Sequence, residues 1–143
     1  MPGADAQYYF LLVQATNAVR RASDRAVLAA AGITTAQAGA LYAIASARTP
    51  TQRELGATLG LGEAAVTGLV GRLERKGLLR RTADPEDRRT RRLVLTEQGT
   101  DALAAIEPAR HTLNARIADA LGDDADRFVA ALSRLATVPE DGG

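Results

Sequence analysis

The 143-residue sequence contains no cysteine and no tryptophan, and it has a single histidine, His111. Without cysteine the chain can form no disulfide, thiolate nucleophile, thiol metal site or thiol redox sensor. The serines are scattered without catalytic partners, and Gly60-x-Gly62 follows no predicted strand, so no dinucleotide loop is expected. We therefore predict no enzymatic activity, no catalytic residue, no cofactor and no metal site.

Long apolar runs and targeting signals are also missing. No stretch reaches the ~18 apolar residues that a membrane-spanning helix needs. The short apolar stretch 8–13 follows no basic region, which argues against a signal peptide. We therefore expect a cytoplasmic protein without membrane contact. Aromatic residues make up 3% of the chain, and none lies in residues 72–92, so binding of RNA or single strands by stacking is disfavoured.

An amphipathic helix is predicted over residues 63–76. One side carries apolar residues at helical spacing: Val66, Leu69, Val70 and Leu73. The opposite side has very small side chains apart from its last member: Ala64, Gly68, Gly71 and Arg75. Each glycine in a helix interior costs about 1 kcal/mol relative to alanine. A face this smooth favours close approach of the helix backbone to another surface.

Positive charge is concentrated next to this helix. Residues 72–92 hold nine basic and four acidic side chains, a local net charge of +5, whereas the whole chain carries +1. A directed contact with a polyanion would explain such a distribution. The alternative is that the arginines only keep a hairpin edge solvated. The smooth helix beside the charge favours DNA over that alternative.

A change of hydrophobic period after Gly77 predicts two short strands, residues 79–82 and 91–95, around a basic loop. Helix, glycine stop, strand, loop and strand form the plan of a winged helix. A capping box, Thr51-x-x-Glu54, begins a short helix just before the amphipathic one, which completes a helix-turn-helix. The predicted fold is mainly α with a small β-hairpin, and residues 34–96 form the winged helix-turn-helix.

Both chain ends are predicted to be helical, and we expect residues 1–33 and 97–143 to form a dimerisation region within one compact fold. Residues 8–13 are apolar on all sides, which favours cover by a partner chain; the alternative is a helix packed into its own core. Pro108 interrupts the apolar stripe after residue 97 without shifting its phase, so a kink is expected rather than two helices. Asp123 and Asp124 are expected to cap the last helix.

Several short motifs in residues 52–99 resemble the signature of the MarR (multiple antibiotic resistance regulator) family. They are Val66-Thr67, Arg72-Leu73-Glu74, Gly77-Leu78, Asp84-Pro85, Asp87-x-Arg89 and Leu95-Thr96-x-x-Gly99. The resemblance implies a homodimeric winged-helix transcription regulator, most often a repressor, that small aromatic anions release from double-stranded DNA. A two-fold dimer of this kind would bind an inverted-repeat operator with half-sites about 34 Å apart.

The resemblance also implies which residues meet DNA. Recognition-helix positions would lie in the major groove, wing-tip arginines in the minor groove, and the start of the preceding helix at a phosphate. The residues expected at DNA are Thr51, Gln52, Ala64, Ala65, Thr67, Gly68, Arg72, Arg75, Arg88, Arg89 and Arg91. Asp87 is expected to orient Arg89 through a charge-assisted hydrogen bond. Arg91 and Arg92 either contact phosphates or lie on the strand surface.

This sequence departs from the family pattern at positions 64, 65, 68 and 71, where alanine or glycine replaces polar or charged residues. Direct contacts to base edges should therefore be few, limited to Thr67, the alanine methyl groups and Arg72. Specificity should depend instead on the shape of the minor groove.

Two features of function stay open in the sequence. A pocket for an aromatic anion would be lined by Tyr8, Tyr9, Arg20, Tyr42 and His111, but their spacing does not establish one. A winged-helix protein–protein adaptor without DNA binding is the alternative function, because the same fold also serves assembly. Salt-dependent DNA binding that depends on the wing arginines would separate the two.

Overall fold

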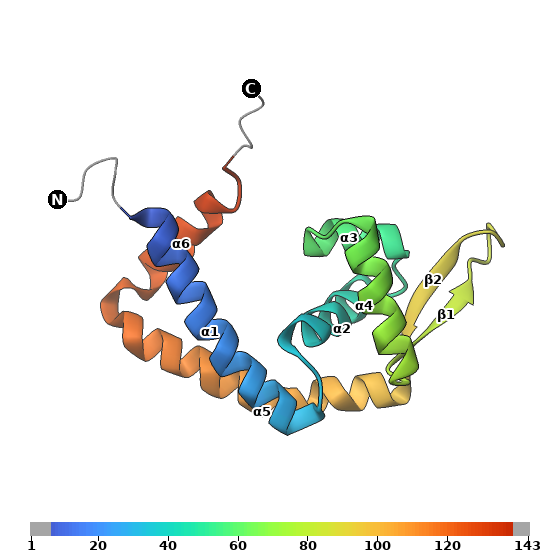
Figure 1. The fold of residues 1–143 in the computed structure, drawn as a ribbon, viewed down its shortest axis with the longest axis horizontal. Helices are drawn as coiled ribbons and strands as arrows, with labels where there is room; N and C mark the ends of the chain where they lie inside the picture. The colour runs from blue at the N-terminus through green and yellow to red at the C-terminus, as the bar shows by residue number, and fades with distance from the viewer. Residues whose placement is uncertain (1–6, 139–143) are drawn as a thin grey trace. The chain divides into compact units, whose positions relative to one another are not determined.

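The computed structural model describes residues 7–138 as a mainly helical protein with one two-stranded antiparallel sheet (Figure 1). Its elements are α1 (Tyr8–Ala31), α2 (Thr35–Ala47), α3 (Gln52–Leu59), α4 (Glu63–Arg75), β1 (Leu79–Ala83), β2 (Arg91–Leu95), α5 (Glu97–Leu121), a 3₁₀ turn (Gly122–Asp124) and α6 (Ala125–Leu135). The predicted fold class is confirmed. The chain divides after Arg110 into two compact units, which are described separately.

The first unit has a continuous apolar core. The side of α4 predicted to be apolar is buried throughout, packed with the C-terminal part of α1, α2, α3, the hairpin and the first turns of α5. Its members are Val27, Ile33, Ala38, Ala40, Leu41, Ile44, Leu55, Val66, Leu69, Val70, Leu73, Leu78, Leu79, Leu93 and Ile106. The opposite side of α4 is therefore left to face away from this core.

Two capping boxes fix where the helices before α4 begin, and the second is the one predicted at Thr51-x-x-Glu54. The Thr34 hydroxyl accepts from the Gln37 N–H at 3.1 Å, and the Gln37 side chain accepts from the Thr34 N–H at 3.1 Å. Thr51 and Glu54 make the same reciprocal pair at 3.1 and 3.0 Å at the start of α3. Each box satisfies two backbone donors that the first helical turn leaves unpaired.

The turn between α3 and α4 depends on a close approach at Gly56. A Cβ atom at Gly56 would lie 3.1 Å from Cγ2 of Val66 and 3.3 Å from the carbonyl oxygen of Leu61. Gly60 ends α3 in the left-handed region with φ +65°. The two helices of the helix-turn-helix are thus packed nearly as tightly as their backbones allow.

The hairpin is joined to the helices at its base. Leu79 pairs with Leu95 and Ala83 with Arg91, so β1 extends one residue beyond its predicted end. The Leu93 N–H donates to the carbonyl of Pro50 at 2.8 Å, which adds the segment before α3 to the edge of β2. This bond fixes the root of the wing against the helix-turn-helix.

The Leu95-Thr96-x-x-Gly99 motif joins the end of α4 to the start of α5. The Thr96 hydroxyl donates to the Gly77 carbonyl at 2.6 Å and accepts from the Gly99 N–H at 3.1 Å, so Thr96 caps α5 as its sequence position suggested. A Cβ atom at buried Gly99 would collide with the carbonyl oxygen of Leu78. Only glycine allows α5 to start this close to the end of the winged helix.

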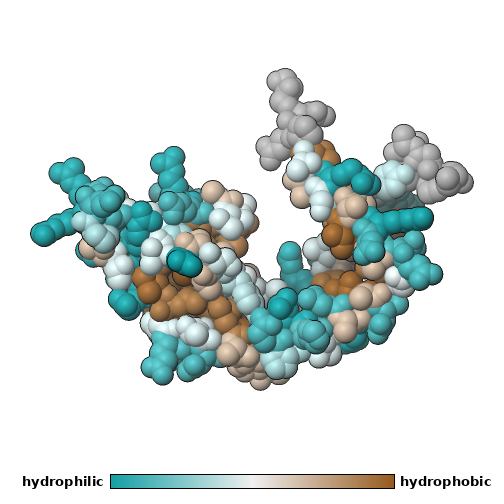
Figure 2. All heavy atoms as spheres, turned by 180° about the vertical axis from the view of Figure 1, so that it is seen from behind, coloured by the Kyte–Doolittle hydropathy of each residue, from teal (hydrophilic) through white to brown (hydrophobic). Residues whose placement is uncertain are grey.

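The chain ends show little burial. Tyr8, Tyr9 and Phe10 at the start of α1 are 61%, 76% and 66% exposed, so they do not pack into their own chain's core. Figure 2 shows apolar surface, in brown, in the part of the molecule that leads to the grey chain ends. No single helix among the described residues is long and apolar enough to cross a membrane.

The second unit, described over residues 111–138, contains the end of α5, the 3₁₀ turn and α6. α5 continues through Pro108 as one helix rather than two, as expected. The prediction that an aspartate side chain caps the last helix is wrong. Asp124 precedes α6, but its side chain makes no capping bond. The reason is that residues 122–124 already form a helical turn, which leaves Asp124 with helical backbone angles (φ −87°, ψ −1°) instead of the extended geometry of an N-cap.

Candidate nucleic-acid interface

The exposed side of α4 presents short side chains and two arginines. Ala64, Ala65 and Thr67 are exposed, and Gly68 is half-buried. Because the residues between them are buried in the core, this side is the one that an external surface can approach. The structure therefore places the predicted recognition residues together on one accessible helix face.

The glycines on this face have a function that was not predicted from the sequence. A Cβ atom at Gly68 would lie 3.3 Å from Nη1 of Arg72, and one at Gly71 would lie 3.4 Å from Nη1 of Arg75. Each arginine therefore lies back along the helix over the glycine four residues before it. The face is not bare but holds two guanidinium groups close to the backbone. The signal in the sequence is the pair of Gly-x-x-x-Arg spacings.

A chain of polar contacts connects β1, α3 and α4. Arg81 donates from Nε to Glu74 at 3.1 Å and from Nη1 to Oε1 of Gln52 at 3.2 Å. Nε2 of Gln52 donates to the Thr67 hydroxyl at 2.8 Å, and that hydroxyl donates to the Glu63 carbonyl at 2.8 Å. Sequence analysis missed Arg81 as a member of the site, because its partners are distant along the chain.

The wing loop holds its shape through Asp87, but not in the predicted way. One oxygen of Asp87 accepts from the backbone N–H of Arg89 at 3.0 Å, and the other accepts from the Thr90 hydroxyl at 3.0 Å. The expected contact with the Arg89 guanidinium is replaced by these two bonds, since a carboxylate two residues earlier reaches the backbone first. Arg88, Arg89 and Arg91 are exposed.

Arg92 braces the root of the wing, which corrects its assignment as a phosphate contact or a plain surface residue. Its Nε donates to Asp84 at 2.6 Å, and its Nη1 donates to the carbonyl of Thr49 at 2.9 Å. The Glu86 N–H and then the Arg92 guanidinium hold the pKa of the nearly buried Asp84 carboxyl below its usual value. Arg81 and Arg92 are bonded within the fold, and the other exposed arginines of residues 72–92 lie on α4, on the wing loop and, as Arg80 and Arg91, on the two strands.

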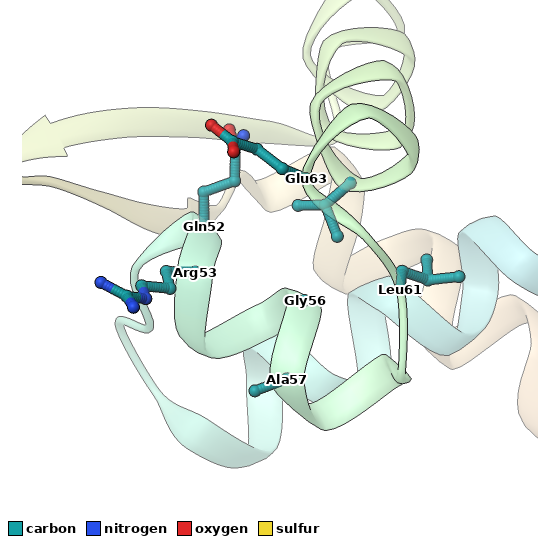
Figure 3. Close-up of a pocket in the computed structure, with 7 residues that line it drawn as sticks. Gln52, Arg53, Gly56, Ala57, Leu61 and Glu63 are labelled. Atoms are coloured by element: carbon teal, nitrogen blue, oxygen red, sulfur yellow. The ribbon is translucent and has the colours of Figure 1, made fainter. Parts of the chain in front are cut away.

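A hollow of about 570 Å³ lies between α3 and the start of α4 (Figure 3). Gln52 and Arg53 from α3 and Glu63 from α4 line it, together with the apolar side chains of Leu61 and Val66. Thr51 and Gln52 are half-buried, and the Thr51 hydroxyl is occupied as the cap of α3. The hollow therefore separates the beginnings of the two helices of the helix-turn-helix.

Of the predicted ligand residues, the structure brings Tyr9 and Arg20 to one hollow. Tyr9 and Arg20 line a shallow hollow of about 320 Å³ on α1, and Tyr8 is exposed. The Tyr42 hydroxyl donates to Glu107 at 2.8 Å; burial first, and this bond second, raise the pKa of Tyr42. His111 belongs to the other unit. Residues 7–138 contain no cluster of three or more His, Asp or Glu side chains that could hold a metal ion.

Comparisons with known proteins agree with this geometry. Residues 31–90 match the MarR family. The chain is 32% identical over 115 residues to a putative transcriptional regulatory protein for the hcr operon of Thauera aromatica, a match that covers 78% of this chain and 68% of that protein. It is 32% identical over 118 residues to the transcriptional activatory protein BadR of Rhodopseudomonas palustris, with 80% and 66% covered.

The fold is similar to a solved structure that contains DNA. The transcriptional repressor CouR, bound to a 23-mer DNA duplex, superposes with a TM-score of 0.82 and 28% sequence identity. The match covers 90% of this chain and 92% of CouR.

Proposed function

This chain belongs to the MarR family of DNA-binding transcription regulators, which are not enzymes, and on that premise we propose that it is a cytoplasmic repressor that binds an inverted-repeat operator as a homodimer. Membership in this family rules out the adaptor without DNA binding. The observation that carries the proposal is that the arginines have two different roles. Arg81 and Arg92 form ion pairs within the fold, whereas the arginines of α4 and the wing loop are exposed.

In this proposal α4 enters the major groove and the wing reaches the neighbouring minor groove. The small side chains at 64, 65 and 68 allow close approach, while Arg72 and Arg75 lie low enough along the helix not to prevent it. Arg88 and Arg89 at the wing tip supply the charge that a narrow minor groove attracts. Arg91 and the N-terminus of α3 at Thr51 and Gln52 lie near phosphates.

Dimerisation is supported by the apolar side chains that one chain leaves exposed. Phe128, Val129, Leu132 and Leu135 form one side of α6 and are 38% to 63% exposed. The start of α1 adds three aromatic side chains, each more than half exposed. Surfaces of this kind on a single chain typically become covered by a partner. A second copy would cover them and would set two α4 helices one DNA turn apart, about 34 Å.

Repression follows if the dimer occupies DNA that RNA polymerase needs. CouR is a repressor and BadR is an activator, so related proteins work in both directions. We propose repression and release by a small aromatic anion, with Tyr8, Tyr9, Arg20, Tyr42 and His111 as the candidate contacts.

The test is selection of bound duplexes from a random DNA pool, followed by band shifts on the selected sequence with and without 4-hydroxybenzoate. We expect an inverted repeat with half-site centres about ten base pairs apart, binding of two chains, and affinity that falls steeply with salt. A reporter gene behind the operator should be silenced by the protein. Activation of the reporter would overturn repression, and a bound single half-site would overturn the dimer.

A further inference from the structure

The polar chain through Gln52 has a fixed direction. An arginine guanidinium can only donate hydrogen bonds, so the Gln52 atom 3.2 Å from Arg81 is its oxygen. The amide nitrogen of Gln52 must then face Thr67, where it donates to the hydroxyl at 2.8 Å. The bond to Arg81 therefore orients the Gln52 amide so that its nitrogen, and not its oxygen, faces the Thr67 hydroxyl.

The Thr67 hydroxyl is consequently engaged on the protein side. Its single proton goes to the Glu63 carbonyl at 2.8 Å, and one lone pair accepts from Gln52. With no proton left, this hydroxyl cannot donate to an acceptor on a base edge. Exposed Thr67 therefore has two groups left to present, the second lone pair of its hydroxyl and its methyl group.

Most neighbours of Thr67 on the helix surface have very short side chains, and the exception is Glu63, four residues before it. Residues 64, 68 and 71 lie three before, one after and four after it, and all are alanine or glycine. Arg72 lies low over Gly68 instead of standing beside Thr67. Among residues 64–71, Thr67 therefore has the longest side chain on the exposed face.

We propose that the Thr67 methyl group reads the 5-methyl group of one thymine in each operator half-site, and that Gln52 and Arg81 are positioning residues for this contact. The inference rests on the proposed placement of α4 in the major groove. Thymine is the base that presents a methyl group there, and apolar contact is the way proteins recognise it. Because the hydroxyl has no proton to donate, the contact distinguishes thymine from uracil through the methyl group and not through a hydrogen bond donated to the base.

The experiment is a cycle that removes the two methyl groups separately and together. In the operator selected from the random pool, each symmetric pair of thymines is replaced by deoxyuridine, and binding is measured at fixed salt. At one position the wild type should lose about fourfold in affinity per half-site, the effect of one buried methyl group. Thr67→Ser should lose the same factor on the thymine operator and should show no further loss with deoxyuridine.

Three further variants separate this contact from general damage. Thr67→Val keeps a methyl group and should retain the deoxyuridine penalty. Thr58→Ser is the matched control, because Thr58 is an exposed threonine on α3 whose hydroxyl makes the same bond to the carbonyl four residues before it, at 3.1 Å. It should leave both affinities unchanged. Arg81→Met should reduce the deoxyuridine penalty while the salt dependence of binding stays as in the wild type, since Arg81 is assigned no phosphate.

The outcomes distinguish this inference from the proposed function. A well-defined operator with no thymine position sensitive to deoxyuridine would overturn the inference and leave the proposed function standing. The same conclusion would follow if Thr67→Ser kept the full deoxyuridine penalty. A pool that yields no preferred duplex would overturn both.

Discussion

The winged helix and the chain ends differ in what stabilises them. Among residues 7–138, every buried apolar side chain lies between Val27 and Ile106, in or directly beside the winged helix. The first four turns of α1 and residues 111–138 contribute none, although both are rich in apolar residues. The winged helix is therefore built around a core of its own, whereas the described parts of the chain ends leave apolar side chains exposed.

Among these changes, Gly99→Ala should destabilise the winged helix most. The added methyl group would collide with the Leu78 carbonyl, a backbone atom that cannot move without shifting β1 or α5. We expect a loss of about 3 kcal/mol in the free energy of unfolding and a fall of about 10 °C in Tm. Gly39→Ala in α2, where a Cβ meets nothing within 4 Å, is the matched control and should not lower Tm. Equal Tm values for both variants would contradict the assigned close approach.

The chain ends should respond in the opposite way, losing assembly but not folding. Leu132→Asp places a charge on the exposed apolar side of α6 and should weaken the proposed dimer on the order of a hundredfold. Analytical ultracentrifugation measures the change, and circular dichroism should show the helices intact. Ala130→Asp, on the other side of α6, introduces the same charge and should leave the dimer unchanged. Dissociation by both variants would argue against a specific interface.

The wing tip tests whether the outward charge of the winged helix reaches DNA. Arg89→Ala removes an exposed guanidinium from a loop that Asp87 shapes through the backbone, so the loop should stay in place. Operator affinity should fall roughly tenfold or more in a band-shift titration at fixed salt. Arg25→Ala, an equally exposed arginine on α1, is the control and should have little effect. Little change with Arg89→Ala would remove the wing from the interface.

Gly68→Ala separates folding from function within α4. Alanine should stabilise the helix by about 1 kcal/mol, but its Cβ would stand 3.3 Å from the Arg72 guanidinium and displace it. We therefore expect a higher Tm together with operator affinity that is a few times weaker. A higher Tm with unchanged affinity would show that the position of Arg72 does not matter.

The smallest effect concerns pH at the wing root. The pKa of Asp84 is held below its usual 3.8, so its charged form stabilises the fold. That stabilisation is complete above pH 3.8 and disappears as the pH falls through the lower pKa of the folded state. Wild type should therefore exceed Asp84→Asn in Tm at pH 7, and the difference should shrink only below about pH 4. A constant difference down to pH 2 would contradict this role.

Local chemistry explains which features the sequence predicted well. The capping box at Thr51 depends on a partner three residues away, so the start of α3 followed directly from the sequence. The apolar stripe of α4 was also predicted in full.

Side-chain partners distant in sequence were not predictable in this way. Arg92 meets Thr49 across 43 residues, and Arg81 meets Gln52 across 29, so neither partner could be identified from the charge pattern. The site was therefore predicted as a surface, but the roles of its individual cations required the fold.

The tight contact at Gly56 has a consequence for regulation. A Cβ atom added at Gly56 would lie 3.1 Å from Val66, and Gln52 is bonded to Thr67, so α3 and α4 are in close contact at both points. In the proposed dimer, α3 and α4 of each chain would move as one unit. The distance between the two α4 helices would then change while each helix pair keeps its shape. An effector would then switch the regulator by changing the distance between the two α4 helices, so that they no longer reach successive turns of the operator.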